Sequence, residues 1–355
     1  MTNFAIRFPK ALNVLLIAAS LISTAGYAGN TEDGFDWAAE AERRAHVAGN
    51  PIIGKPLAPI TLKDLNNQPL ALSEHLGKRP IYLKFWATWC GPCREQMPHF
   101  EKISQKYADK MAVIAVNTGI NDDIEDVQAY LKTIALTMPV VRDDGTLAAA
   151  LELTVTPQHI LIDKQGRVVW LGHKDDAQFL AVLDRVANNN YTPKIVAQAT
   201  VKPQKALAIN VSNWRLQKAV TLTTVHNKSI TLPVAGDKPT YVWFNSPWCE
   251  WYLADSKPAT SKACAALRKL ASSSSNLGHW VAVSLDVWAN EEDVIGYLDQ
   301  HKLKIPTVLD DTKALFKNFG IRNLPSLVVL KPDGTIIMTK TFTSAKEVEL
   351  FAQAL

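Results

Sequence analysis

The sequence is poor in the residues that mark several common classes of protein. Only four of its 355 residues are cysteine, so a scaffold held mainly by disulfides is excluded and each domain must rest on a packed core. Sixteen glycines and 19 prolines are too few for a collagen-like or proline-rich fibrous chain. Charge of one sign is also scarce, because 38 Lys and Arg face 34 Asp and Glu. A dispersed net charge of +4 gives no reason to expect a nucleic-acid partner.

Long apolar runs are also lacking, apart from one close to the N-terminus. Residues 11–22 are almost entirely apolar, follow two basic residues, and lead to small residues at Gly26 and Ala28. This order predicts a secretory signal peptide over residues 1–28, cleaved after Ala28. A retained anchor is the alternative, but the run is shorter than the roughly 20 residues that span a bilayer. We therefore expect a periplasmic protein without a stable membrane span after cleavage, in a compartment where disulfides persist.

The chain contains two copies of one domain-sized pattern. The segment YLKFWATWC at residues 82–90 matches YVWFNSPWC at residues 241–249, and residues 126–169 match residues 293–337. The second copy carries a short insertion just after its first cysteine. A repeat of this length indicates two tandem copies of a domain rather than a solenoid.

Within each copy, short apolar runs typical of strands alternate with segments of helical periodicity. Residues 81–85 and 111–116 have strand character, whereas residues 91–107 repeat apolar side chains every three or four positions. This alternation indicates an α/β fold in which helices cover a sheet. The expected organisation is a signal peptide (1–28), an N-terminal segment (29–50), a first domain (51–190), a linker (191–216) and a second domain (217–355).

The strongest chemical signal is the sequence Trp89-Cys90-Gly91-Pro92-Cys93 at a predicted strand-to-helix junction. Backbone N–H groups at a helix start favour an anion, which lowers a thiol pKa and makes Cys90 the attacking thiolate. Cys93, one turn further in, would resolve the mixed disulfide. The alternatives are half of a zinc site, for which no second pair of ligands exists, and an inert structural disulfide. The Gly-Pro dipeptide and the preceding Trp favour the redox interpretation over both.

Residues 54–100, GKPLAPITLKDLNNQPLALSEHLGKRPIYLKFWATWCGPCREQMPHF, resemble the TlpA/ResA-like exported thiol–disulfide oxidoreductases. The resemblance extends over residues 51–190 and, more weakly, over residues 221–355. It implies two tandem thioredoxin-like domains, each with a central mixed sheet and helices on both faces. The sequence has no phosphate-binding loop, dinucleotide fingerprint or metal-protease helix, so we expect no bound cofactor beyond the redox-active disulfide, and no metal.

The resemblance also implies where a substrate binds. In the family, a cis-proline loop faces the disulfide and holds the substrate chain by backbone pairing. Thr156-Pro157 matches that loop in the first copy, and Leu324-Pro325 matches it in the second. Trp89, Thr156 and Pro157 are therefore the expected substrate-binding residues.

Two departures from the family pattern concern proton handling. Lys84 stands six residues before Cys90, where cytosolic thioredoxins keep a buried acid. The segment 117–121 lacks the Glu that ResA-like proteins place after this strand, although Asp122 and Asp123 follow it. We interpret these two residues as a charge pair at a helix N-terminus.

The second copy has lost the CxxC motif. Cys249 aligns with Cys90, but Tyr252 takes the place of Cys93, and the remaining cysteine is Cys264. A structural Cys249–Cys264 disulfide is the first of three interpretations and requires Cα atoms within about 7 Å. The others are a second redox pair, with Cys249 at a helix start, and free thiols or a Cu(I) site.

The second copy is also rich in tryptophan. We expect Trp243 and Trp280, in strand-like runs, to lie in the core. Trp248 and Trp251 flank Cys249 and are either loop filler or, together with Pro325, a contact surface for a protein partner.

These observations predict an exported thiol–disulfide oxidoreductase that reduces protein disulfides through Cys90 and Cys93. The second domain would recognise the substrate or partner, and the resemblance implies a membrane thiol carrier of the DsbD/CcdA type as electron donor. The alternatives are a disulfide donor or isomerase, and a binding or copper-handling protein that uses the second-domain cysteines. The direction of the reaction depends on the reduction potential, which the motif does not determine.

Overall fold

A computed structural model describes residues 36–193 and 209–355. The expected signal peptide over residues 1–28 lies outside the described residues. The first described element is helix α1 (Trp37–Gly49), and residues 38–355 form one compact unit that contains both copies of the repeat.

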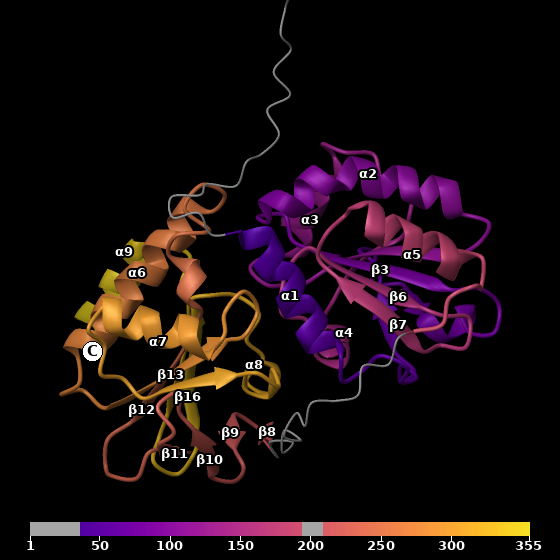
Figure 1. Ribbon diagram of the computed structural model, residues 1–355. Coiled ribbons are helices and arrows are strands. Elements are labelled where there is room, and N and C mark those ends of the chain that lie inside the picture. Colours follow the sequence, from indigo (N-terminus) through magenta and orange to yellow (C-terminus); the bar gives the residue numbers. More distant parts are fainter. Residues whose placement is uncertain (1–35, 194–208) are drawn as a thin grey trace, which may run out of the picture. The chain divides into compact units, whose positions relative to one another are not determined.

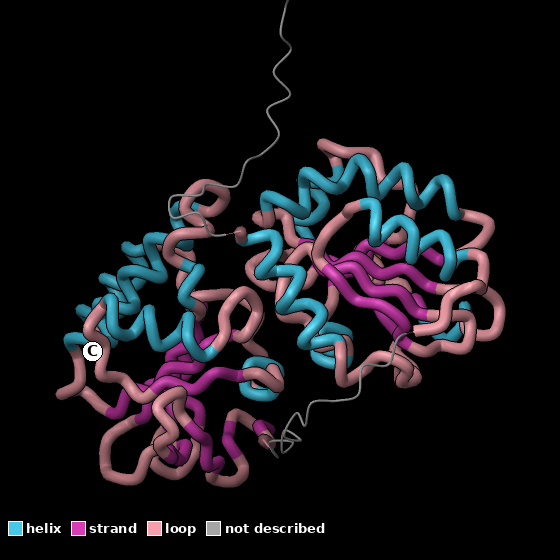
Figure 2. Tube along the Cα trace, in the orientation of Figure 1, coloured by secondary structure: helices cyan, strands magenta, loops and turns pink. Residues whose placement is uncertain are grey.

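The first domain is built on a five-stranded mixed sheet (Figures 1 and 2). Its strands, in spatial order, are β5 (Val140–Arg142), β4 (Ala112–Asn117), β3 (Ile81–Trp86), β6 (Gln158–Ile162) and β7 (Val168–Gly172). β3 pairs in parallel with β4 and antiparallel with β6. All six residues of β3 are buried, because a central strand is covered on both faces.

Helices α2 and α5 pack on the aromatic side chains of this sheet. The Tyr82 ring lies 5.1 Å from the Phe100 ring of α2 and 5.4 Å from the Phe179 ring of α5. Asp123 and Asp176 cap the helices that follow them, each accepting a hydrogen bond from the third residue on. The helices of the domain are α2 (Gly91–Tyr107), α3 (Ile124–Leu131), α4 (Thr146–Ala150) and α5 (Ala177–Ala187), with a short 3-10 helix η1 (Leu72–His75).

The second domain repeats this topology strand for strand. Its sheet has the order β14 (Thr307–Asp310), β13 (His279–Leu285), β12 (Thr240–Asn245), β15 (Ser326–Leu330) and β16 (Ile336–Thr341). Its helices are η2 (Pro247–Cys249), α6 (Pro258–Ser273), α7 (Glu291–Gln300), α8 (Ala314–Asn318) and α9 (Ala345–Gln353). Trp243 and Trp280 are buried in its core, as the strand pattern predicts. The expected pair of tandem thioredoxin-like domains is confirmed.

In the described residues, three two-stranded hairpins accompany the large sheets. They are β1 (Thr61–Lys63) with β2 (Pro69–Ala71), β8 (Val211–Ser212) with β9 (Arg215–Leu216), and β10 (Val220–Thr223) with β11 (Ser229–Leu232). The β8–β9 hairpin falls at the end of the expected linker, and its Leu216 N–H donates to Gly334 O of the second domain. Residues 211–216 therefore pack with the second domain.

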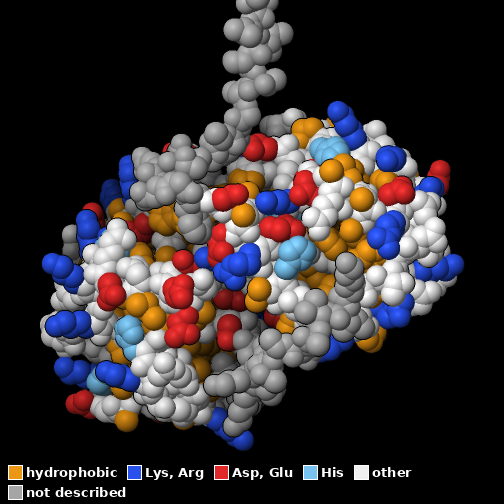
Figure 3. All heavy atoms as spheres, viewed as in Figure 1, with side chains coloured by type: hydrophobic (Ala, Val, Ile, Leu, Met, Phe, Trp, Pro, Cys, Tyr) orange, Lys and Arg blue, Asp and Glu red, His pale blue; other side chains and the backbone are white. Residues whose placement is uncertain are grey.

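The surface carries both charge signs. On the face in Figure 3, acidic and basic side chains are interspersed over both domains. None of the helices in the described ranges is long and apolar enough to cross a bilayer.

Candidate functional site

Cys90 and Cys93 form a disulfide across the start of α2. Their Cα atoms are 5.2 Å apart, and Cys90 is the N-cap residue of the helix. The Cys93 N–H donates to the Cys90 sulfur at 3.2 Å. In the reduced pair the same N–H and the helix N-terminus would stabilise a thiolate on Cys90. Both cysteines are 0% exposed in the described chain.

A buried carboxylate fixes the loop that leads to Cys90. Asp122 accepts hydrogen bonds from the Thr88 N–H at 2.7 Å, from the Thr88 hydroxyl at 2.5 Å and from the Asn117 amide at 2.7 Å. Burial raises the pKa of Asp122, and the hydrogen bonds from Thr88 and Asn117 and the nearby Lys257 oppose that rise. The expectation of a charge pair at a helix N-terminus is correct for Asp123, the N-cap of α3, but wrong for Asp122, which is buried.

The peptide bonds before Pro157 and Pro325 are both cis. Thr156, immediately before Pro157, is fully buried. Its hydroxyl accepts a hydrogen bond of 3.0 Å from the indole N–H of Trp288 in the second domain. The His173 ring is hydrogen-bonded to the Pro157 carbonyl at 2.8 Å.

The first domain has a buried amine at the position where cytosolic thioredoxins have an acid. Lys84 is 0% exposed, its Nζ has no hydrogen-bond partner among the described residues, and it lies 5.1 Å from the centre of the Phe100 ring. Burial lowers the pKa of Lys84 to about 7, and the charge of Asp175 opposes this shift. Its neighbour across the sheet is His159, whose pKa lies well below its ordinary value because the ring is buried.

The second domain carries its own disulfide. Cys249 and Cys264 are joined, with Cα atoms 6.1 Å apart, inside the limit that the sequence argument required. Cys249 ends η2, whereas α6 begins only at Pro258. The inserted residues therefore separate Cys249 from the start of the long helix, and the expected helix start at Cys249 is wrong.

Replacement of Cys249 and Cys264 by serine should lower the free energy of unfolding by about 3 kcal/mol. A closed loop of roughly 15 residues restricts the unfolded chain by this amount. Urea unfolding of the double variant, compared with the oxidised parent, measures the difference. An unchanged midpoint would contradict a structural role.

The tryptophans beside Cys249 have different surroundings. Trp248 is 1% exposed, and its indole N–H donates to the Val287 carbonyl at 2.6 Å. Its ring stacks on Trp89 of the first domain, with ring centres 5.0 Å apart. Trp251 is 60% exposed. In this structure, the contact surface expected at Trp248 is therefore occupied by the first domain, and Trp251 alone remains open.

Two residues that the sequence analysis did not single out also lie at this contact. Asn121 and Trp288 follow β4 and β13 in equivalent loops, and both have left-handed backbone angles, with φ of 51° and 59°. Asparagine tolerates this conformation, whereas tryptophan rarely adopts it. The only sequence signal for either residue is its equivalent position after the same strand in the two copies.

A five-stranded mixed sheet, a CxxC disulfide that caps a helix and a cis-proline loop define a thioredoxin-like protein. The family model for the AhpC/TSA family matches residues 53–171. The chain is 37% identical over 114 residues to the thioredoxin-like protein YneN of Bacillus subtilis, covering 32% of this chain and 66% of that protein. It is 34% identical over 120 residues to the thiol-disulfide oxidoreductase ResA of Bacillus cereus, covering 33% of this chain and 67% of that protein.

The first domain places the chain in the ResA-like family of thiol–disulfide oxidoreductases. The chain spans about two thirds of the length of these curated relatives. One solved structure, a putative thiol:disulfide interchange protein DsbE from Chlorobium tepidum, is similar with 26% identity and a TM-score of 0.35, covering 39% of this chain and 96% of that chain.

Proposed function

We propose that this protein is exported and reduces protein disulfides through Cys90 and Cys93. The observation that carries the proposal is the position of Cys90 as the N-cap of α2, one turn from its disulfide partner. This position favours the thiolate that attacks a substrate disulfide. The family membership of the first domain supports the same chemistry.

Each step of the reaction is balanced within the pair. The Cys90 thiolate attacks a substrate disulfide, forms a mixed disulfide and releases one substrate thiolate. Cys93 then attacks the Cys90 sulfur, which frees the second substrate thiolate and leaves the Cys90–Cys93 disulfide. A dithiol donor must reduce the pair again, and a membrane thiol carrier of the DsbD/CcdA type is our proposal for that donor.

Export is supported by the sequence of residues 1–28 and by the structural Cys249–Cys264 disulfide, since disulfides of this kind persist in oxidising compartments. The copper-handling alternative requires free thiols at Cys249 and Cys264, whereas the structure joins them.

The reduction potential of the Cys90–Cys93 pair tests the direction of the reaction. We expect a value near about −270 mV, as in thioredoxin, rather than near about −120 mV, as in DsbA. The full chain would be equilibrated with glutathione or dithiothreitol buffers, trapped with an alkylating reagent and digested. Mass spectrometry then gives the oxidised fraction of each cysteine pair separately. A value near that of DsbA would make the protein a disulfide donor.

A further inference from the structure

We propose that the second domain is an intramolecular ligand of the redox face of the first, and that it must leave this face before Cys90 reacts. This inference rests on the proposed function, because it concerns access to the same disulfide. The redox face is defined here as Trp89, Cys90, Asn121 and the loop 154–157.

The first observation concerns the surroundings of the disulfide. Trp89, which precedes Cys90, contacts two aromatic rings of the second domain. The Trp248 ring stacks on it at 5.0 Å, and the Tyr252 ring meets it edge-on at 5.9 Å. Cys90 is 0% exposed, so a protein disulfide has no path to its sulfur in this arrangement.

The second observation concerns the loop 154–157 of the redox face, which is already occupied. The backbone N–H of Trp288 donates to the Thr154 carbonyl at 2.8 Å, and its indole N–H donates to the Thr156 hydroxyl at 3.0 Å. A backbone donor from the second domain therefore pairs with the loop 154–157. By resemblance to the family, this loop is the one expected to bind a substrate chain. The same position cannot hold both at once.

The contact is reciprocal between the two copies. The Asn121 N–H donates to the Arg322 carbonyl at 3.2 Å, and its side-chain amide donates to the Leu324 carbonyl at 2.7 Å. The Leu324 N–H donates back to the Asn121 side chain at 3.0 Å. Asn121 thus contacts the second cis-proline loop from the same position that Trp288 uses on the first. Such exchange of equivalent contacts is the pattern of a two-fold dimer.

The pairing chemistry identifies the kind of partner that the redox face fits. It accepts the loop after the second long strand of another thioredoxin-like domain, together with the tryptophan that precedes that domain's first cysteine. An external partner of the same fold would present the same two features and would have to displace the second domain.

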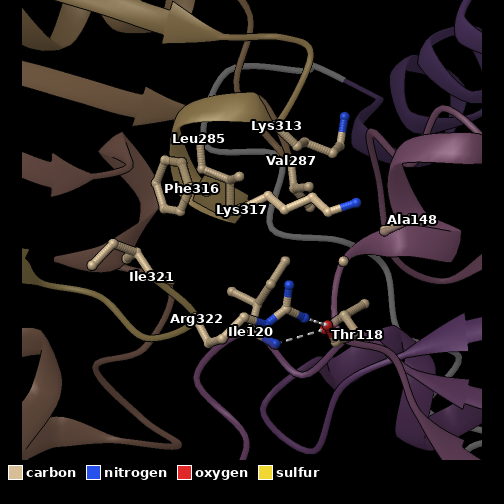
Figure 4. A pocket seen from close by; sticks show the side chains of 11 residues that line it. Thr118, Ile120, Ala148, Leu285, Val287, Lys313, Phe316, Lys317, Ile321 and Arg322 are labelled. Atoms are coloured by element: carbon tan, nitrogen blue, oxygen red, sulfur yellow. Dashed lines mark hydrogen bonds between the residues drawn. The ribbon is translucent and has the colours of Figure 1, made fainter. Parts of the chain in front are cut away.

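Polar contacts accompany the aromatic rings at this interface. The Arg322 guanidinium donates to the Thr118 carbonyl at 2.5 Å (Figure 4) and to the Asp143 carbonyl at 2.8 Å. Lys257 pairs with Asp126 at 2.6 Å. A small cavity beside Arg322 is lined by side chains of both domains (Figure 4).

The test measures how fast the oxidised full chain is reduced. Reduced thioredoxin serves as a bulky dithiol and dithiothreitol as a small one, and each passes two electrons and two protons to the Cys90–Cys93 disulfide. Arg322→Ala removes the hydrogen bonds from the second domain to the Thr118 and Asp143 carbonyls. Asn121→Ala removes the side-chain hydrogen bonds from the first domain to Leu324. We expect each variant to be reduced by thioredoxin at least 10-fold faster than the parent, with a smaller gain for dithiothreitol. Small-angle X-ray scattering should show a larger radius of gyration for both variants than for the parent.

Arg215→Ala is the matched control. Arg215 also donates from its guanidinium to a backbone carbonyl, that of Asp333, but this contact lies within the second domain. Parental rates in both Arg322→Ala and Asn121→Ala would overturn the proposal, and so would an equal acceleration in Arg215→Ala. Circular dichroism confirms that each variant is folded.

Insulin reduction separates this inference from the proposed function. If Arg322→Ala and Asn121→Ala are reduced faster but no form reduces insulin, the inference that the second domain blocks the redox face stands, and the proposed function fails. If every form reduces insulin at the parental rate and no variant is reduced faster, the proposed function stands, and the inference that the second domain blocks the redox face fails.

Discussion

Cys90→Ser is expected to lower the rate of insulin reduction by at least about 100-fold, because the variant has no nucleophile at the start of α2. Serine keeps the size and the capping geometry of the residue, so the fold should be retained. The rate would be followed by the turbidity of the released insulin B chain, with dithiothreitol as electron source.

Cys93→Ser should fail in a different way. Cys90 can still attack a substrate disulfide, but the mixed disulfide has no internal thiol to resolve it. We expect a covalent complex that appears as a mass increase and disappears on treatment with excess reductant. The Cys249→Ser/Cys264→Ser double variant is the matched control, because it removes the disulfide of the second domain and leaves the first intact.

Insulin reduction by Cys90→Ser at the parental rate would end the proposed function.

The sequence predicted the parts of the site that depend on local order along the chain. The CxxC motif follows a buried strand, so its place at the junction of β3 and α2 could be predicted from the run of apolar residues before it. The duplication also predicted the shared sheet order, because equivalent segments in the two copies fold alike.

The burial of individual polar side chains could not be predicted in this way. Asp122 and Asp123 are neighbours of one type, yet only Asp123 caps α3, while Asp122 turns inward to Thr88 and Asn117. Which of two adjacent carboxylates is buried depends on donors that tertiary packing brings together. The sequence places Thr88 far from Asp122.

The contact between the domains could not be predicted from the sequence either. Trp248 had two interpretations, loop filler and partner surface, because an aromatic residue buries its ring against either kind of surface. The structure gives it a third role as an internal contact with Trp89. A duplicated sequence shows that two domains exist, but the surfaces on which they meet depend on the shapes of folded loops.

Lys84→Met is expected to increase the free energy of unfolding at pH 7 by about 4 kcal/mol. Within the part of the chain that the structure describes, the ammonium group of Lys84 has no hydrogen-bond partner, and Lys84 is 0% exposed, so the folded state carries the cost of its desolvation. Methionine has a similar length and an apolar end, which fits beside the Phe100 ring without that cost.

The gain should depend on pH in a defined direction. Because burial lowers the pKa of Lys84 from 10.5 to about 7, the folded protein binds fewer protons than the unfolded chain between these two values. The free energy of unfolding of the parent therefore rises with pH through this window, relative to the variant. The cost of burying the amine is complete below pH 7 and fades as the pH approaches 10.5.

Urea unfolding of the parent and of Lys84→Met at pH 6 and pH 10 tests both statements. Lys340→Met is the matched control, because Lys340 also lies over an aromatic ring, that of Phe342 at 5.2 Å, but is partly exposed. We expect this control to change the free energy of unfolding by less than about 0.5 kcal/mol at either pH. If Lys84→Met gains as much at pH 10 as at pH 6, packing rather than the buried charge accounts for its effect. If the variant is less stable than the parent at both values, Lys84 stabilises the fold, and its burial carries no net cost.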